Sequence, residues 1–128
     1  MKHEVSVEDG IVLAVLSGPI SPEGYVAVAR DIMKLPGWNP GMRVLIDYTY
    51  LDLKKEMGAD APTYAEALAP LRKAMGRSRV ACVNNRSVEF GLGRMFQVFV
   101  QELTDLEVGI FYTFEEAMNW LTGPDRTP

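Results

Sequence analysis

The chain has 128 residues, of which 48% are apolar and 23% are charged, a composition that fits one globular domain around one hydrophobic core. Its formal charge of −4 excludes a general attraction to nucleic acid or anionic lipid, because both need net or clustered positive charge. No apolar run approaches the ~20 residues that cross a bilayer, and the start MetLysHisGluVal lacks an apolar signal region. We therefore expect a cytoplasmic protein without stable membrane insertion.

The first residues predict a β-hairpin. Residues 2–8 alternate weakly between polar and apolar, residues 11–16 are apolar throughout, and Asp9-Gly10 between them is a strong turn signal. The two strands should therefore be antiparallel neighbours. The continuous apolar run of the second strand is typical of an interior strand that is covered on both faces.

A helix should follow this hairpin. Residues 17–19, SerGlyPro, are expected to end the second strand. Ser21 then fits an N-cap with Pro22 at the first helical position, and the helix should stop before Pro36-Gly37.

The middle of the chain predicts a strand over residues 43–48 and a helix that begins at Thr63. Thr63 and Glu66 have the spacing of a capping box, and Pro70 should kink the helix. Residues 49–61 have little apolar periodicity and are left without an assignment.

The last third of the chain predicts two strand–helix units. A strand over 79–83 precedes a helix over 87–103, and a strand over 107–111 precedes a helix that starts at Thr113, where Glu116 completes a second capping box.

The resulting order is β-β-α-β-α-β-α-β-α, which indicates an α/β domain over residues 1–122 with a frayed tail over 123–128. Strands two to five should be parallel and joined by right-handed crossovers, with the first strand antiparallel at the side of a five-stranded sheet.

Ligands of such sheets bind at the carboxyl ends of the strands, where helix N-termini also converge. The candidate site residues at this edge are Ser17, Asp47, Tyr48, Asn84, Ser87 and Tyr112. Each also has a structural interpretation: Ser87 as a helix cap, Asn84 as a turn residue, and the two tyrosines as half-buried aromatics.

The helix over 87–103 has more apolar surface than one sheet face needs. Its apolar face comprises Val88, Leu92, Met95, Phe96, Phe99 and Leu103, and Phe90, Val98 and Val100 extend it around the helix. Two explanations remain open: close packing on a neighbour or a partner subunit, and a small apolar pocket or lipid-facing groove beneath the helix.

Enzyme classes find little support. His3 is the only histidine and lies near the start, so Ser-His and Cys-His catalysis and histidine-based metal sites lack a base or ligand. Cys82 is the only cysteine and lies inside an apolar strand, which is typical of a small buried residue. We therefore expect no catalytic residue, no metal and no cofactor.

One basic cluster stands out in this acidic chain. It comprises Arg72, Lys73, Arg77 and Arg79. These cations either complement the dipole of a nearby helix C-terminus or form a phosphate-binding patch.

The segments ArgValAlaCysVal (79–83), PheGlyLeuGlyArgMetPhe (90–96), ValGlyIlePhe (108–111) and PheGluGluAlaMetAsnTrpLeu (114–121) resemble the SpoIIAA-like group of bacterial STAS/SEC14-type domains. The resemblance implies about four successive β/α turns and a non-catalytic role, as in anti-sigma antagonists and lipid-binding relatives. Antagonists of that group carry a phosphorylatable serine in an AspSer pair after the third strand. This chain has TyrLeuAspLeuLys at residues 50–54, so Leu53 and not a serine or threonine directly follows Asp52.

Two functions follow as hypotheses. The first is a regulatory module that binds a protein partner, with a possible homodimer, through a helix face and the rim of the sheet. The second is a carrier or sensor of a small apolar or amphipathic ligand, held between the 87–103 helix and the sheet. Arg94, Phe96 and Phe99 of that helix join the candidate binding residues.

Overall fold

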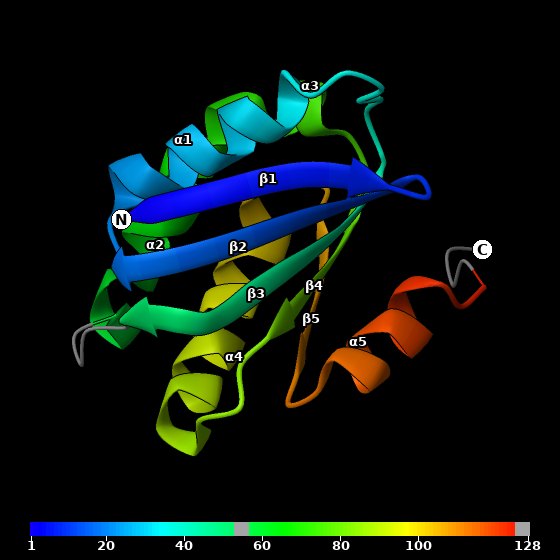
Figure 1. Cartoon of the computed structure of the whole chain (residues 1–128). Coiled ribbons are helices and arrows are strands. Elements are labelled where there is room, and N and C mark those ends of the chain that lie inside the picture. The colour runs from blue at the N-terminus through cyan, green and yellow to red at the C-terminus, as the bar shows by residue number, and fades with distance from the viewer. Residues whose placement is uncertain (53–56, 125–128) are drawn as a thin grey trace.

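The computed structural model describes residues 1–52 and 57–124, without the side chains of residues 57–60 and 87–93 (Figure 1). The strands are β1 (Lys2–Glu8), β2 (Ile11–Pro19), β3 (Arg43–Asp52), β4 (Arg79–Val83) and β5 (Glu107–Phe111). The helices are α1 (Pro22–Met33), α2 (Met57–Leu68), α3 (Arg72–Met75), α4 (Ser87–Leu103) and α5 (Phe114–Leu121), with a 3-10 turn, η1 (Ala69–Leu71), between α2 and α3. The predicted order of elements is confirmed, with the second predicted helix divided at η1.

The five strands lie in the order β1-β2-β3-β4-β5. Strand β1 is antiparallel to β2 and the other neighbours are parallel, as predicted. The hairpin turn between β1 and β2 is formed by Asp9 at φ 54° and Gly10 at φ 76°. Both values are positive, as a type I′ turn requires, and this turn suits the right-handed twist of the flanking strands.

Strands β2 and β3 are longer than the sequence predicts. Their pairing continues to Pro19 and Asp52, past a register shift between Val15 and Ser17. The prediction that residues 17–19 end the second strand is therefore wrong. Gly18 follows the irregularity with a positive φ of 81°, which glycine adopts without strain, and it stays paired with Leu51 of β3.

This pairing makes one edge of the sheet uneven. Strands β4 and β5 end at Val83 and Phe111, and the register aligns both residues with Asp47. The last residues of β3 therefore extend beyond β4. Residues 53–56, which belong to the stretch left without assignment, lie outside the described residues.

Two separate apolar clusters cover the two faces of the sheet. The larger one joins α1, α2, α3 and α4 to the sheet, and the smaller one joins α5 to β3 and β4. Figure 1 shows α4 and α5 on opposite sides of β4 and β5.

Strand β2 is interior, as predicted, but it is not covered equally on both faces. Val12, Ala14 and Leu16 face the larger cluster and are fully buried. Ile11 and Leu13 on the other face are only half-buried. The physical reason is that α5 is the only described helix on that face, and it packs on β3, β4 and β5.

The second predicted helix begins earlier than its capping box suggests. Helix α2 starts at Met57, so Thr63 is an interior residue and Pro62 lies inside the helix. The predicted N-terminus at Thr63 is wrong because tertiary packing outweighs the local signal: Ala61 and Ala65 are completely buried in the larger cluster. At Pro70, where the sequence predicts a kink, the α-helix is interrupted by η1 and resumes as α3.

The caps of the other helices differ from one another. Ser21 Oγ accepts a hydrogen bond from the Gly24 N–H at 3.0 Å, and Thr113 Oγ1 accepts one from the Glu116 N–H at 3.2 Å, so both predicted caps are confirmed. The interpretation of Ser87 as a cap is wrong, because Arg86 occupies the N-cap position of α4 and makes no side-chain cap bond.

Candidate functional site

An apolar cavity of about 80 Å³ lies between the helices and the sheet. Its walls come from α1, β3, β4, β5, the end of α2, α3 and α4. Its lining residues include Tyr25, Tyr48, Cys82 and Phe96. The cavity therefore lies beneath the described part of α4, where the second hypothesis expects a pocket.

Tyr25 is the centre of an aromatic group at this cavity. Its ring lies 5.2 Å from that of Phe96, 5.7 Å from Tyr64 and 6.4 Å from Tyr48, measured between ring centroids. The contacts with the two tyrosines are edge-to-face, an arrangement that aromatic rings prefer. These rings hold α1, α2, α4 and β3 together around one point.

The hydroxyl of Tyr25 is buried without a hydrogen-bond partner among the described residues. Desolvation by burial raises the pKa of Tyr25 well above 10.0, so the group stays a neutral donor at physiological pH. A buried hydroxyl without a partner costs about 1–3 kcal/mol relative to a satisfied one. A polar atom that entered the cavity beside Tyr25 would remove this cost.

Cys82 and Tyr48 form a second polar contact in the same wall. The Cys82 thiol donates to the Tyr48 hydroxyl oxygen at 3.6 Å. Burial raises the pKa of Cys82 to about 12, so the thiol remains protonated and unreactive at neutral pH. Both groups contribute shape and weak polarity, and neither is a nucleophile.

The candidate residues at the carboxyl ends of β3 and β4 take part in local turns. Asp47 Oδ1 accepts a hydrogen bond from the Thr49 N–H at 2.9 Å, and Asn84 Oδ1 accepts one from the Arg86 N–H at 3.1 Å. Asn84 is 1% exposed, and its Nδ2 has no partner among the described residues. These bonds agree with the interpretation of Asn84 as a turn residue.

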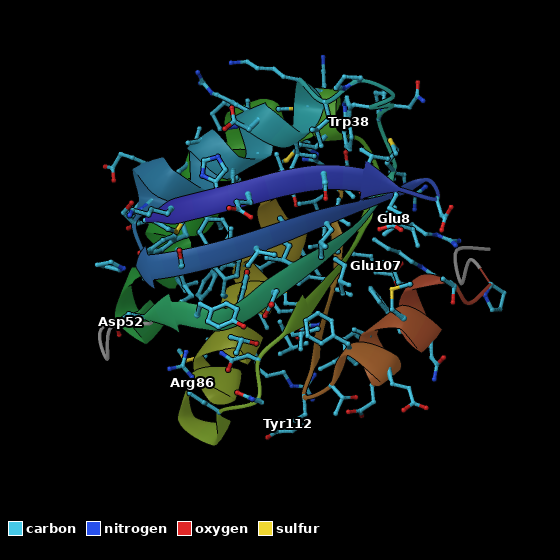
Figure 2. All side chains as sticks on the ribbon, viewed as in Figure 1. Glu8, Trp38, Asp52, Arg86, Glu107 and Tyr112 are labelled. Atoms are coloured by element: carbon cyan, nitrogen blue, oxygen red, sulfur yellow. The ribbon has the colours of Figure 1, made fainter. Side chains whose placement is uncertain are left out.

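Arg86 connects the uneven strand ends. Its guanidinium donates to the Leu51 carbonyl oxygen at 2.5 Å, in the part of β3 that extends beyond β4. Figure 2 shows Arg86 at this edge, between Asp52 and Tyr112. Hydrogen bonds within the chain therefore stabilise this edge of the sheet, at the carboxyl ends of β3 and β4.

The structure does not bring all predicted site residues together. Tyr48 is a core residue that lines the cavity, and Tyr112 is exposed just after β5. Ser17 lies within β2 and lines a shallow hollow with Val15 and Tyr50. The side chain of Ser87 lies outside the described residues.

The candidate residues of α4 lie partly in the core and partly on the surface. Phe96 is buried and Phe99 is half-buried, whereas Arg94 is exposed. Met95, placed on the apolar face by its spacing, is 47% exposed, and Val98 is 54% exposed. The buried face is centred on Phe96 and Val100, so Met95 and Val98 belong to the part of the wide apolar face that the sheet does not cover.

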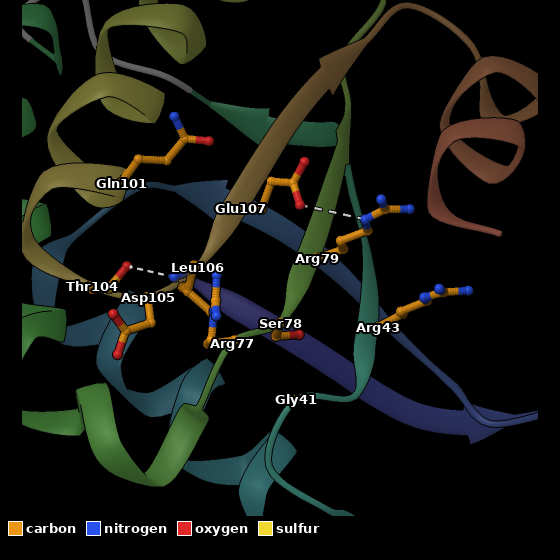
Figure 3. Close-up of a pocket in the computed structure, with 10 residues that line it drawn as sticks. All are labelled: Gly41, Arg43, Arg77, Ser78, Arg79, Gln101, Thr104, Asp105, Leu106 and Glu107. Atoms are coloured by element: carbon orange, nitrogen blue, oxygen red, sulfur yellow. Dashed lines mark hydrogen bonds and ion pairs between the residues drawn. The ribbon is translucent and has the colours of Figure 1, made fainter. Parts of the chain in front are cut away.

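A polar hollow of about 680 Å³ opens at the opposite edge, at the amino ends of β3, β4 and β5 (Figure 3). Arg79 donates to the carbonyl oxygens of Trp120, Gly123 and Pro124 at 3.1, 3.1 and 2.7 Å. Arg79 also pairs with Glu107 at 3.4 Å. Two residues of the predicted frayed tail are thereby bonded, and residues 125–128 lie outside the described part.

Arg72 of the same basic cluster has an acidic partner. It forms two hydrogen bonds with Asp105, and this pairing lowers the pKa of Asp105. Together with the bonds that Arg79 makes at the end of α5, this favours the interpretation of the cluster as complementing helix ends and carboxylates over the phosphate-binding interpretation.

Sequence reasoning missed Tyr25 and Cys82 as functional candidates. The helical spacing of Tyr25 with Val28 and Ile32 already indicates that the ring faces the core. No local signal could show that its hydroxyl lacks a partner, because this depends on residues from four other elements.

Among the side chains that the structure describes, no group of three or more from His, Cys, Asp and Glu could hold a metal ion. Within residues 1–52 and 57–124, every helix is too short or too polar to cross a membrane.

No family model and no curated protein matches the sequence. The structure is similar to that of an uncharacterised protein of the DUF3478 family with a SpoIIAA-like fold from Shewanella loihica PV-4. The TM-score is 0.58 with 18% sequence identity, and the match covers 94% of this chain and 92% of that chain. This similarity confirms a SpoIIAA-like fold.

Proposed function

We propose that this SpoIIAA-like domain is a non-catalytic binding module that holds a small, mostly apolar molecule in the cavity between α4 and the sheet. The observation that carries this proposal is an apolar cavity of about 80 Å³ that is lined by Tyr25, whose buried hydroxyl has no partner among the described residues. Among the described residues, the cavity provides no charged group and no activated nucleophile. The lining of the cavity therefore favours binding of a ligand over catalysis.

The volume limits the ligand. An apolar cavity of about 150 Å³ holds benzene, which has six carbon atoms, so a cavity of about half that size accepts about three non-hydrogen atoms without rearrangement. A larger molecule, including a probe of about five non-hydrogen atoms, needs side chains of the wall to move. Met33 and Met75 in the wall are flexible enough to do so.

The chemistry of the ligand follows from the wall. Nearly all of the surface is aliphatic or aromatic, and the Tyr25 hydroxyl can donate one hydrogen bond. A ketone, aldehyde or ester group on a short apolar body satisfies both requirements. A charged ligand would lose its hydration without an opposite charge in the wall.

The test compares 2-butanone with 2-methylbutane, which have similar shape but differ in the oxygen. We expect both to perturb the NMR signals of residues around the cavity, and the ratio of their affinities to fall about fivefold in a Tyr25→Phe variant, because one hydrogen bond is worth about 1 kcal/mol.

Tyr64→Phe is the matched control, because Tyr64 packs against the same rings without lining the cavity. In this variant the ratio should stay at the wild-type value. Binding of neither probe, with 2-butanone at about 100 mM and 2-methylbutane at saturation in water, or an unchanged ratio in Tyr25→Phe, would contradict the proposal.

A protein-binding role is the second candidate, and exposed apolar side chains of α4 favour it. Met95 and Val98 are neighbours on one helix face and are about half exposed. We propose this face as the contact for a regulatory partner. A Met95→Lys/Val98→Lys variant should lose partners that the wild-type protein captures from its native host, whereas Glu115→Lys, which makes the same change of net charge on α5, should keep them. Retention of every partner by the double variant would exclude this surface.

A further inference from the structure

The two edge strands of the sheet, β1 and β5, differ in whether side chains bind their outer backbone groups. At the β5 edge, Gln101 Oε1 accepts a hydrogen bond from the Val108 N–H at 2.9 Å, and the Gln97 side-chain amide donates to the Val108 carbonyl oxygen. These side chains of α4 occupy backbone groups that a further strand would need. Strand β1, at the other edge, pairs only with β2 in the described part of the chain.

The hairpin register defines which backbone groups of β1 are available. Glu8 and Ile11 flank the type I′ turn, so they form a hydrogen-bonded pair. Such pairs alternate along an antiparallel ladder. The N–H and C=O groups of His3, Val5 and Val7 therefore point away from β2, toward the free edge.

Charged side chains on an edge strand usually discourage pairing, because a second copy brings like charges together. Lys2, Glu4 and Glu8 are exposed on the face of β1 away from α1. Their neighbours on β2 are Ser17, Val15 and Ile11, so the ladder itself offers them no opposite charge. No salt bridge to these three side chains occurs among the described residues.

The sequence of β1 is complementary to itself when a second copy runs antiparallel. In the register centred on Val5, Lys2 of each copy lies opposite Glu8 of the other, and Glu4 lies opposite Ser6. The outward groups of His3, Val5 and Val7 then meet each other, which gives a complete ladder.

Neighbouring registers that keep the outward groups paired are unfavourable. If the second copy shifts by two residues so that Val5 lies opposite His3, Glu4 lies opposite Glu4. If it shifts by two residues the other way, so that Val5 lies opposite Val7, Glu4 lies opposite Glu8. Like charges directly opposite each other destabilise a strand pair, whereas opposite charges stabilise it. The charges of β1 therefore select one register.

We infer that β1 is a homodimer interface, in which two copies of this chain join their sheets about a two-fold axis through Val5. Such an interface is self-complementary and closed, so association stops at two copies. Val5 and Val7 of both copies stay on the helix-covered side, where they already pack against the larger cluster. Helix α1 packs on the same side of β1, so the two-fold axis brings both α1 helices side by side above the joined sheet.

The interface is short. A single strand pair buries less than the roughly 1,600 Å² of a standard interface, so the dimer should be concentration-dependent. It would not use the cavity or the exposed face of α4, and it is independent of the proposed function.

Sedimentation equilibrium of the full chain tests the inference. We expect a monomer–dimer equilibrium whose dissociation constant rises about tenfold in Lys2→Glu and in Glu8→Lys, because each substitution turns two attractive pairs into repulsive ones. The double variant Lys2→Glu/Glu8→Lys restores opposite charges and should dimerise like the wild type. An equimolar mixture of the two single variants should form a heterodimer for the same reason.

Glu4→Lys is the matched control, since it changes the net charge as Glu8→Lys does but lies opposite Ser6 in this register. All substituted side chains are exposed, so circular dichroism and melting temperatures should remain at wild-type values. A monomer at all concentrations overturns the inference. A dimer that ignores both single reversals overturns it equally, because it must use another surface.

Discussion

The guanidinium of Arg79 lies 5.4 Å from the centre of the Trp120 ring and donates a hydrogen bond of 3.1 Å to the carbonyl oxygen of the same residue. Strand β4 thereby holds the last turn of α5 through one buried side chain. The same guanidinium also binds the carbonyl oxygens of Gly123 and Pro124. The end of the helix is satisfied by a residue far away in sequence.

Replacement of Arg79 should destabilise the domain strongly. Arg79→Leu removes the donor of the Pro124 carbonyl oxygen and the partner of Glu107, and it leaves the Trp120 and Gly123 carbonyl oxygens with only their longer bonds from the Gly123 N–H (3.3 Å) and Arg43 (3.4 Å). We expect the free energy of unfolding to fall by about 3 kcal/mol. Urea denaturation measures this difference. Arg77→Leu, an exposed neighbour, should cost less than about 0.5 kcal/mol. Similar losses in both variants would show that the Arg79 bonds contribute little.

The glutamines beside β5 should prevent association at that edge. A Gln97→Leu/Gln101→Leu variant frees the N–H and C=O of Val108, so we expect higher oligomers in light scattering at concentrations where the wild type has at most two copies. Glu102→Leu controls for the added apolar surface and should not form them. Wild-type behaviour of the double variant would remove this role from the glutamines.

Alkaline pH should destabilise the fold through Cys82. Burial raises its pKa in the folded state from 9.0 to about 12, so the unfolded chain loses this proton first as pH rises. The contribution of Cys82 to stability is therefore constant below about pH 9 and declines between about pH 9 and 12, by about 1.4 kcal/mol per pH unit.

The pKa of Tyr25 is raised well above 10.0 by burial, so ionisation of this group in the unfolded chain also lowers the free energy of unfolding, at pH values above about 10. Denaturation curves of the wild type and Cys82→Ala at several pH values separate the two groups. The difference between the two proteins should shrink as pH rises above about 9. A pH-independent difference would mean that the thiolate is accommodated in the folded state.

The N-cap of α5 should contribute measurably. Thr113 Oγ1 accepts a hydrogen bond from the Glu116 N–H and donates one to the Glu116 carboxylate at 3.0 Å. Thr113→Ala removes both and should lower the free energy of unfolding by about 1 kcal/mol, whereas Thr113→Ser should restore most of it. Thermal denaturation detects this change. Equal stability of the alanine and serine variants would assign the effect to the methyl group instead.

Much of the fold could be predicted because its signals are local. The Asp9-Gly10 turn, the Ser21 and Thr113 caps and the apolar strands each depend on a few neighbouring residues, and all lie where the sequence indicates. Ser17-Gly18-Pro19 and Thr63 also carry strong local signals, yet both predictions failed. Pairing with β3 and the burial of Ala61 and Ala65 outweighed them.

The sequence by itself determined the order of the elements, the direction of the strands and the charge pattern of β1, because these follow from turn chemistry, periodicity and composition. Only the tertiary structure decided that Tyr48 and Phe96 line a cavity, that the Tyr25 hydroxyl has no partner among the described residues, and that β5 is covered where β1 is open. The physical reason is that a cavity or a free edge is defined by the side chains that surround it, and these come from elements far apart in the chain.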